Sequence, residues 1–200
     1  MDLPAGHSLP FQRAIERIDA ENARDPNLEP CHGAAQPREL LYAQRLTGWL
    51  LKLAPDASES LRLAARCQHI CRWMIPRDSY PMTKAGYLRW RNDLKNFHAR
   101  KAGEILGQAG CDEAVIKKVQ DLNLKKNFPS DPESRVLEDA LCLVFLEFQL
   151  ADLAAKTAED KMINAIQKTW KKMTPAAQQH ALALPFGAKE KQLIDRALAG

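Results

Sequence analysis

The sequence predicts an all-α protein, with residues 1–200 forming one domain of about eight or nine helices. Apolar side chains recur every three or four residues through most of the chain, which is the spacing of one face of an α-helix. Capping residues and prolines stand where these segments begin, and glycines stand where several of them end. No stretch alternates apolar and polar residues between Asn-Gly or Asp-Gly turns, so we expect no sheet of three or more strands.

The helical segments can be taken in order. Phe11, Ile15 and Ile18 share a face and predict a first helix at about residues 9–24, followed by a polar connector at residues 25–36. Residues 133–155 are apolar on nearly every side, which predicts the central core helix. The other expected helices, most of them bounded by a cap, a proline or a glycine, cover about residues 37–53, 56–74, 83–108, 112–122, 157–173, 174–186 and 188–200.

The composition favours a soluble globular protein, with 46% apolar and 27% charged residues. The first residues lack the positive and apolar segments of a secretory signal, and the longest apolar run is interrupted by Glu147 and Asp152. The five cysteines have no compact spacing, as expected for reduced thiols. We therefore expect a cytoplasmic protein that does not associate with a membrane.

Residues 64–103 concentrate positive charge and aromatic side chains. This stretch has nine Lys or Arg against two Asp, a local net charge of +7, whereas the whole chain carries +4. Such a surface can neutralise phosphate and stack on a base. We expect Arg72, Arg77, Arg89 and Arg91 to line one concave face with Trp73 or Tyr87. The full candidate substrate-binding set is Arg66, Arg72, Arg77, Arg89, Arg91, Trp73, Tyr87 and Trp90.

Two histidines in this stretch are candidate metal ligands. In a continuous helix His69 would lie opposite Cys67 and Cys71, so these three side chains would not share one metal. His98 belongs to the next expected helix, and packing of adjacent helices at about 8–10 Å would let His69 and His98 meet. These residues also have structural interpretations. A helical histidine is often a core or hydrogen-bonding residue. Asp139, an acidic residue near the start of an expected helix, would be stabilised there by the helix dipole.

Four segments, QRLTGWL, RCQHICRWMIPRDSYP, GYLRWRNDLKNFHA and LEDALCLVFLE, resemble a domain of unknown function, DUF4202, over nearly the whole chain. That family is distantly similar to the HD superfamily of helical metal-dependent phosphohydrolases, through AARCQHICR, HARKAGEIL and LEDALCLVF. Gln68 stands where the HD pattern has a metal-binding His, and His69 stands where it has an Asp. Glu39 lies near the expected first His, and His98 keeps its residue type.

The resemblance implies an HD-domain-like fold and one divalent metal ion. The implied ligands are Glu39, His69, His98 and Asp139, with Glu138 as the alternative to Asp139. Of these, His69, His98 and Asp139 would be catalytic, since HD chemistry uses the metal to make water nucleophilic. Gln is a weak neutral ligand, so a fold that binds without catalysis is a second possibility.

Three hypotheses for function follow. The first is a metal-dependent phosphohydrolase that acts on a nucleotide or a phosphate ester. The second is a non-catalytic nucleotide- or RNA-binding module that uses residues 64–103. The third assigns the arginines to solvated helix faces and the tryptophans to the core. Under the first two, the expected partner is a phosphate-containing small molecule or RNA.

Overall fold

The computed structural model describes residues 6–31 and 33–199. The fold is all-α, as predicted: the described residues form ten α-helices, two short 3-10 helices, one π-helical segment and one hairpin. In chain order the elements are α1 Leu9–Asn22, β1 Leu28–Cys31, β2 Ala34–Pro37, α2 Arg38–Leu53, α3 Glu59–Arg66, η1 Arg72–Met74, η2 Arg77–Ser79, α4 Lys84–Ala109, α5 Glu113–Asn123, α6 Pro132–Val144, η3 Phe145–Gln149, α7 Leu150–Lys156, α8 Glu159–Trp170, α9 Pro175–Leu182 and α10 Ala188–Ala199.

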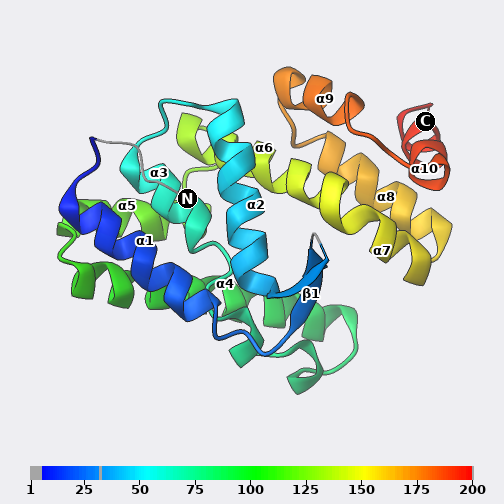
Figure 1. The fold of residues 1–200 in the computed structure, drawn as a ribbon. Helices are drawn as coiled ribbons and strands as arrows, with labels where there is room; N and C mark the ends of the chain where they lie inside the picture. The colour runs from blue at the N-terminus through cyan, green and yellow to red at the C-terminus, as the bar shows by residue number, and fades with distance from the viewer. Residues whose placement is uncertain (1–5, 32, 200) are drawn as a thin grey trace.

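Helix α2 lies at the centre of the fold (Figure 1). It packs against α1, α3 and α6, while α4 packs against α1 and α5, and α10 packs against α7 and α8. Ile18, Leu46, Leu50 and Leu63 are fully buried between α1, α2 and α3. Burying each such side chain contributes about 1.5–3 kcal/mol. This packing holds α2 in place, and the candidate site begins at its N-terminal end.

The helix predicted at residues 133–155 is present as three consecutive segments, but α2 rather than this helix lies at the centre of the fold, and residues 151–153 are exposed. α6, η3 and α7 follow one another without a gap, and Leu137, Leu143 and Leu150 on them are buried. Because η3 is π-helical, its wider turn shifts the register of the side chains that follow it. This change of register divides the expected helix into α6 and α7, which explains why ten helices are found where about nine were expected.

Side-chain caps begin several helices as predicted. The Thr83 and Thr174 hydroxyls accept hydrogen bonds from the backbone N–H three residues later, at 3.1 and 3.3 Å. The predicted start of the third helix at residue 56 is wrong, because Ser58 precedes α3 and accepts the equivalent bond at 3.1 Å. These bonds satisfy N–H groups that have no partner within the helix.

Two predictions of local structure are wrong. Residues 25–36, predicted as a connector, contain most of the antiparallel hairpin of β1 and β2, whose four-residue strands are too short to show an alternating pattern. The helix predicted at residues 56–74 is broken, since α3 ends at Arg66. Cys71 has a φ of 53°, in the left-handed region that an α-helix of L-residues does not use. The chain therefore turns at residues 67–71, and this turn carries His69.

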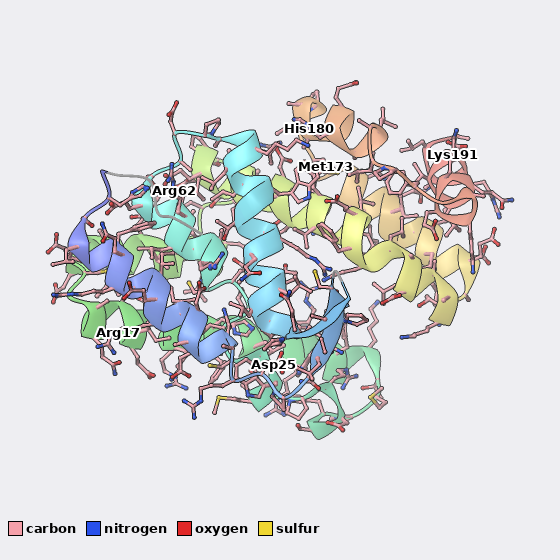
Figure 2. The ribbon with its side chains drawn as sticks, in the orientation of Figure 1. Arg17, Asp25, Arg62, Met173, His180 and Lys191 are labelled. Atoms are coloured by element: carbon pink, nitrogen blue, oxygen red, sulfur yellow. The ribbon has the colours of Figure 1, made fainter. Side chains whose placement is uncertain are left out.

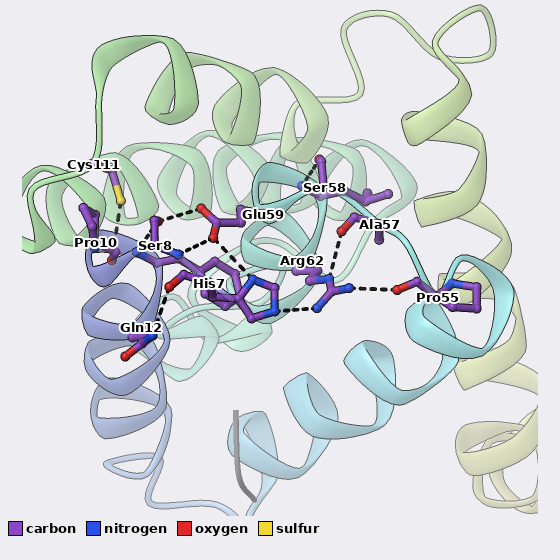
Figure 3. A network of polar contacts seen from close by, with 12 residues as sticks. His7, Ser8, Pro10, Gln12, Pro55, Ala57, Ser58, Glu59, Arg62 and Cys111 are labelled. Carbon is purple, nitrogen blue, oxygen red and sulfur yellow. Dashed lines mark hydrogen bonds and ion pairs between the residues drawn. The ribbon is translucent and has the colours of Figure 1, made fainter. Parts of the chain in front are cut away.

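The start of α1 is tied to the start of α3 by polar contacts (Figure 3). The Glu59 carboxylate accepts hydrogen bonds of 2.7 Å from the backbone N–H and the hydroxyl of Ser8, and it lies 3.3 Å from Nδ1 of His7. Nη1 of Arg62 lies 2.8 Å from Nε2 of His7, and Arg62 also donates to two backbone carbonyls of the preceding loop. These contacts hold residues 7 and 8 against α3.

No helix within the described ranges is both long and apolar enough to cross a membrane. All five cysteines are free thiols. Burial raises the pKa of Cys67, Cys71 and Cys142 to about 12, so these thiols stay protonated and unreactive at neutral pH.

Gly86, in the first turn of α4, is a position that requires glycine. A Cβ there would lie 2.1 Å from the carbonyl oxygen of Pro81, whereas a Cβ at Gly48 in α2 would meet nothing within 4 Å. We expect Gly86→Ala to lower the free energy of unfolding by about 1–3 kcal/mol. The matched Gly48→Ala should raise it by about 0.5–1 kcal/mol. Urea denaturation measures both, and stabilisation by Gly86→Ala would contradict the close contact.

Candidate functional site

Glu39 lies in the first turn of α2 with its side chain buried. Its backbone N–H donates to Oδ2 of Asp25 at 3.0 Å, and Oδ1 of Asp25 accepts from the backbone and side-chain nitrogens of Asn27 at 2.9 and 2.8 Å. Figure 2 shows Asp25 near this end of α2, with His180 toward the other end. Asp25 therefore caps the start of α2 and fixes the position of Glu39.

His69 lies in the turn that follows α3. Its ring stacks on Tyr42 with centroids 4.1 Å apart and an angle of 13° between the ring planes. Its Nδ1 lies 3.6 Å from Oε2 of Glu39, and 24% of its side chain is exposed. Tyr42 thus holds the ring with one nitrogen toward Glu39, while part of the ring reaches solvent.

His98, on α4, is buried beside His69. Its Nδ1 lies 2.8 Å from the carbonyl oxygen of Ile70, and because a carbonyl only accepts, Nδ1 carries the proton. Nε2 therefore holds a lone pair, and it is buried with no hydrogen-bond partner in the described part of the chain. The ring centroids of His69 and His98 are 5.8 Å apart. The fold thus brings together the two histidines that the sequence indicated.

Burial controls the protonation of these three side chains. It raises the pKa of Glu39 to about 7, although the charge of Arg72 acts in the opposite direction. It lowers the pKa of His98 to about 3 and the pKa of His69 well below its usual range, and the charge of Arg72 lowers both further. Both imidazoles are therefore neutral at pH 7 and present lone pairs.

Three buried acceptor atoms in this region have no hydrogen-bond partner among the described residues: Oε2 of Glu39, Nε2 of His98 and Oε1 of Gln68, the neighbour of His69 in the chain. An unpaired buried acceptor costs about 1–3 kcal/mol, and a cation would remove that cost. A histidine whose Nδ1–H donates to a carbonyl is also typical of metal ligands.

In this structure Glu39, His69 and His98 are too far apart to form a metal site. Over the described residues, no three His, Cys, Asp or Glu side chains are arranged so that they could hold a metal ion. Two neutral imidazoles and a carboxylate are nevertheless suitable donors for a divalent transition metal or zinc. The donor types fit a cation, and the side chains would have to move closer together to bind one.

Three arginines lie against two aromatic rings next to the histidines. The guanidinium of Arg72 is 4.9 Å from the ring centroid of Trp90, that of Arg77 is 5.9 Å from Trp90 and 6.0 Å from Tyr87, and that of Arg91 is 5.9 Å from Tyr87. Among the described residues, none of the three has a carboxylate within 4 Å. Arg77 donates to three carbonyls of its own loop, so Arg72 and Arg91 are the arginines available to an anion.

Other residues of the predicted substrate-binding set serve the fold. Arg66 is buried in an ion pair with α1, so it is not available to a substrate. Trp90 is buried and donates from Nε1 to a backbone carbonyl at 2.9 Å, and Trp73 packs against the core. Arg89 is exposed and lies 3.9 Å from a carboxylate on α4. Tyr87 is the exposed aromatic residue of this set.

Asp139 is hydrogen-bonded to the start of α9 and to neither histidine in the described residues. Its two carboxylate oxygens accept hydrogen bonds from the backbone N–H and the hydroxyl of Thr174, at 2.9 and 2.6 Å. It therefore supports the cap of α9 and is not available as a metal ligand. The alternative, Glu138, lies nearer: burial and then the charges of Glu39 and Glu138 raise the pKa of Tyr42, which stacks on His69.

Three residues in contact with His69 or Glu138 were not indicated by the sequence: Tyr42, Lys125 and Lys172. Tyr42 follows Glu39 by three residues, so helical spacing alone places both on one face, and this signal could have identified it. Lys125 and Lys172 lie in polar segments that resemble any exposed loop. Their closeness to Glu138 arises from tertiary packing.

A groove of about 470 Å³ lies elsewhere, between the loop that precedes α3 and the start of α6. Its lining residues are Ala54, Pro55, Asp56, Ala57, Ser58, Leu61, Pro132, Glu133 and Val136. None of these belongs to the cluster of Glu39, His69 and His98.

Comparison with known proteins places the chain in one family. No curated protein and no solved structure matches it, and the HD likeness stays a prediction. The sequence matches a family described as a domain of unknown function (DUF4202) over residues 12–194. Because this match covers nearly the whole sequence, the chain belongs to the DUF4202 family.

Proposed function

We propose that the protein is a cytoplasmic phosphohydrolase that uses one divalent cation, held by Glu39, His69 and His98, to hydrolyse a phosphate ester or a nucleotide. The observation that carries this proposal concerns the described residues: two buried acceptors, Oε2 of Glu39 and Nε2 of His98, have no hydrogen-bond partner there and lie next to arginines that have no carboxylate partner there. The unpaired acceptors of Glu39 and His98 suit a cation, and the donors of the neighbouring arginines suit a phosphate. The free thiols support the location.

Each group has a role in this reaction. A divalent cation supplies Lewis acidity, which makes water nucleophilic at neutral pH. Arg72 and Arg91 neutralise the phosphate through charge-assisted hydrogen bonds. Tyr42 holds the ring of His69, and the carbonyl of Ile70 orients His98. In the overall reaction the oxygen of water bonds to phosphorus, the bond from phosphorus to the leaving oxygen breaks, and the leaving alcohol gains a proton.

Glu39→Gln tests this proposal, because it removes the carboxylate charge with little change of shape. We expect the wild-type protein to contain stoichiometric metal and to hydrolyse p-nitrophenyl phosphate or its diester. The variant should lose at least about tenfold in metal affinity and in kcat/KM. Elemental analysis and a colorimetric assay measure the two effects.

The matched control for Glu39→Gln is Asp139→Asn, the other buried acid of the predicted ligand set. It should keep both metal and activity, because Asp139 bonds to Thr174. Wild-type protein that binds no metal after incubation with Mg²⁺, Mn²⁺ and Zn²⁺ would refute the proposal.

A second candidate function is binding of single-stranded RNA by the exposed part of residues 64–103. It is favoured by the exposed Met82, Tyr87 and Leu88, which lie among Arg72, Arg91 and other cations. Under this reading the affinity for an oligonucleotide should fall steeply as salt rises, since each neutralised phosphate releases counterions. His98→Asn should leave that affinity unchanged, whereas it should abolish hydrolysis under the first reading.

A further inference from the structure

Glu138 binds two lysines that the proposed reaction has not used. This buried carboxylate pairs with Nζ of Lys125 through one oxygen and lies 3.1 Å from Nζ of Lys172 through the other. The lysines come from separate segments, the loop after α5 and the loop between α8 and α9. A buried carboxylate needs a cation to offset its lost hydration. One lysine supplies that charge, so the second leaves the trio with a net positive charge.

The positive charge of the trio is accessible to a ligand. The side chains of Lys125 and Lys172 are 34% and 51% exposed, although Glu138 is only 5% exposed. Each ammonium group has three N–H donors; Lys125 donates one of them to Glu138, and Lys172 forms an ion pair with the same carboxylate. The remaining donors can bind an anion that approaches from solvent, while Glu138 holds the two side chains in position.

The backbone conformation of Lys125 indicates that the surrounding structure fixes the position of this residue. Its φ is 53°, in the left-handed region that non-glycine residues rarely adopt. Such conformations persist where surrounding contacts impose them, often at functional sites. The other non-glycine residue described in this region of φ is Cys71, in the turn between His69 and Arg72. One of the two left-handed residues is thus Lys125 itself, and the other directly precedes Arg72 in the chain.

These cations are close to the candidate site. The segment that carries Lys125 contacts the turn that carries His69, because Nδ2 of Asn123 donates to Sγ of Cys67 at 3.3 Å. Helix α6, which carries Glu138, packs against α2, which carries Tyr42, and Tyr42 stacks on His69 with centroids 4.1 Å apart. His69 therefore has cations near it from two parts of the chain: the arginines of residues 72–91 and the lysines that Glu138 holds.

We propose that Lys125 and Lys172 form a second phosphate-binding group beside His69, and that the substrate carries two adjacent phosphate groups, as in a diphosphate. One phosphate binds Arg72 and Arg91, and the other binds the two lysines. This inference rests on the proposed function for the identity of the site. The two lysines add a second binding group to the site, and this group narrows the substrate from any phosphate ester to a phosphoanhydride or diphosphate.

The test compares inorganic pyrophosphate with inorganic phosphate by titration calorimetry, in buffer that contains a chelator. We expect the wild-type protein to bind pyrophosphate at least about tenfold more tightly than phosphate. Lys125→Met and Lys172→Met should each remove most of that preference, and Lys125→Arg, which keeps the charge, should retain it. Lys126→Met is the matched control, because Lys126 pairs with Asp121 and not with Glu138.

Two results would overturn the inference: wild-type protein with no preference for pyrophosphate, or lysine variants that keep the wild-type preference. Circular dichroism checks that each variant folds, and Lys172 is exposed enough that its replacement should not disturb the core. The chelator removes metal from the measurement. A failure here therefore concerns the lysines, whereas a failure of metal binding concerns Glu39, His69 and His98.

Discussion

His98→Asn is expected to abolish hydrolysis and metal binding while it leaves the fold intact. Asparagine can still donate a hydrogen bond to the Ile70 carbonyl in place of Nδ1, but it has no lone pair at the position of Nε2. Mutation of residues that only orient metal ligands lowers metal affinity or activity by about 10–100-fold. Loss of a ligand itself should therefore lower kcat/KM by at least about a hundredfold. Elemental analysis and the chromogenic assay measure the result.

Comparison of His98→Asn with His98→Ala separates the roles of the two ring nitrogens of His98. His98→Ala should also lose activity, and it should lower the free energy of unfolding by about 1–3 kcal/mol because the buried Ile70 carbonyl loses its donor. His180→Asn is the matched control, since His180 packs edge-on against Trp49 with centroids 5.8 Å apart. Full metal content and activity in His98→Asn would show that His98 is a structural histidine.

The fold was largely predictable because its signals are local. Thr83 and Thr174 cap helices with their own hydroxyls, and the apolar periodicity of residues 133–155 marked a core helix. The break after Arg66 was not predictable in this way. It depends on the left-handed conformation of Cys71, a residue type with no preference for it, so the fold around the turn imposes it.

The site was predictable only where residue type carries the information. His69 and His98 were identified because imidazole is an uncommon side chain with specific chemistry, and the structure places their rings 5.8 Å apart. Lysine and arginine give no such indication. Arg66 pairs with a carboxylate 47 positions away and Lys125 with one 13 positions away, and no local pattern distinguishes these two roles.

Asp19→Ala is expected to cause the largest loss of stability among the variants considered. Asp19 accepts two hydrogen bonds of 2.6 Å from Arg66, whose side chain is only 7% exposed. Removing the carboxylate leaves the guanidinium charge buried, with a single remaining contact of 3.4 Å to Thr47. Breaking a buried pair in this direction costs about 3–5 kcal/mol. We expect the lower end of that range, because Asp19 is 30% exposed and the opened site admits water.

Arg66→Met provides the comparison that identifies the role of Arg66. The carboxylate of Asp19 can be hydrated where it stands, and methionine fills much of the volume of the arginine stem, so the loss should be only about 1–2 kcal/mol. Urea denaturation of both variants should therefore rank Asp19→Ala as the less stable. If Arg66 stabilises the fold, folded Arg66→Met should keep the wild-type kcat/KM, whereas a substrate-binding Arg66 requires a rise in KM without a comparable loss of stability.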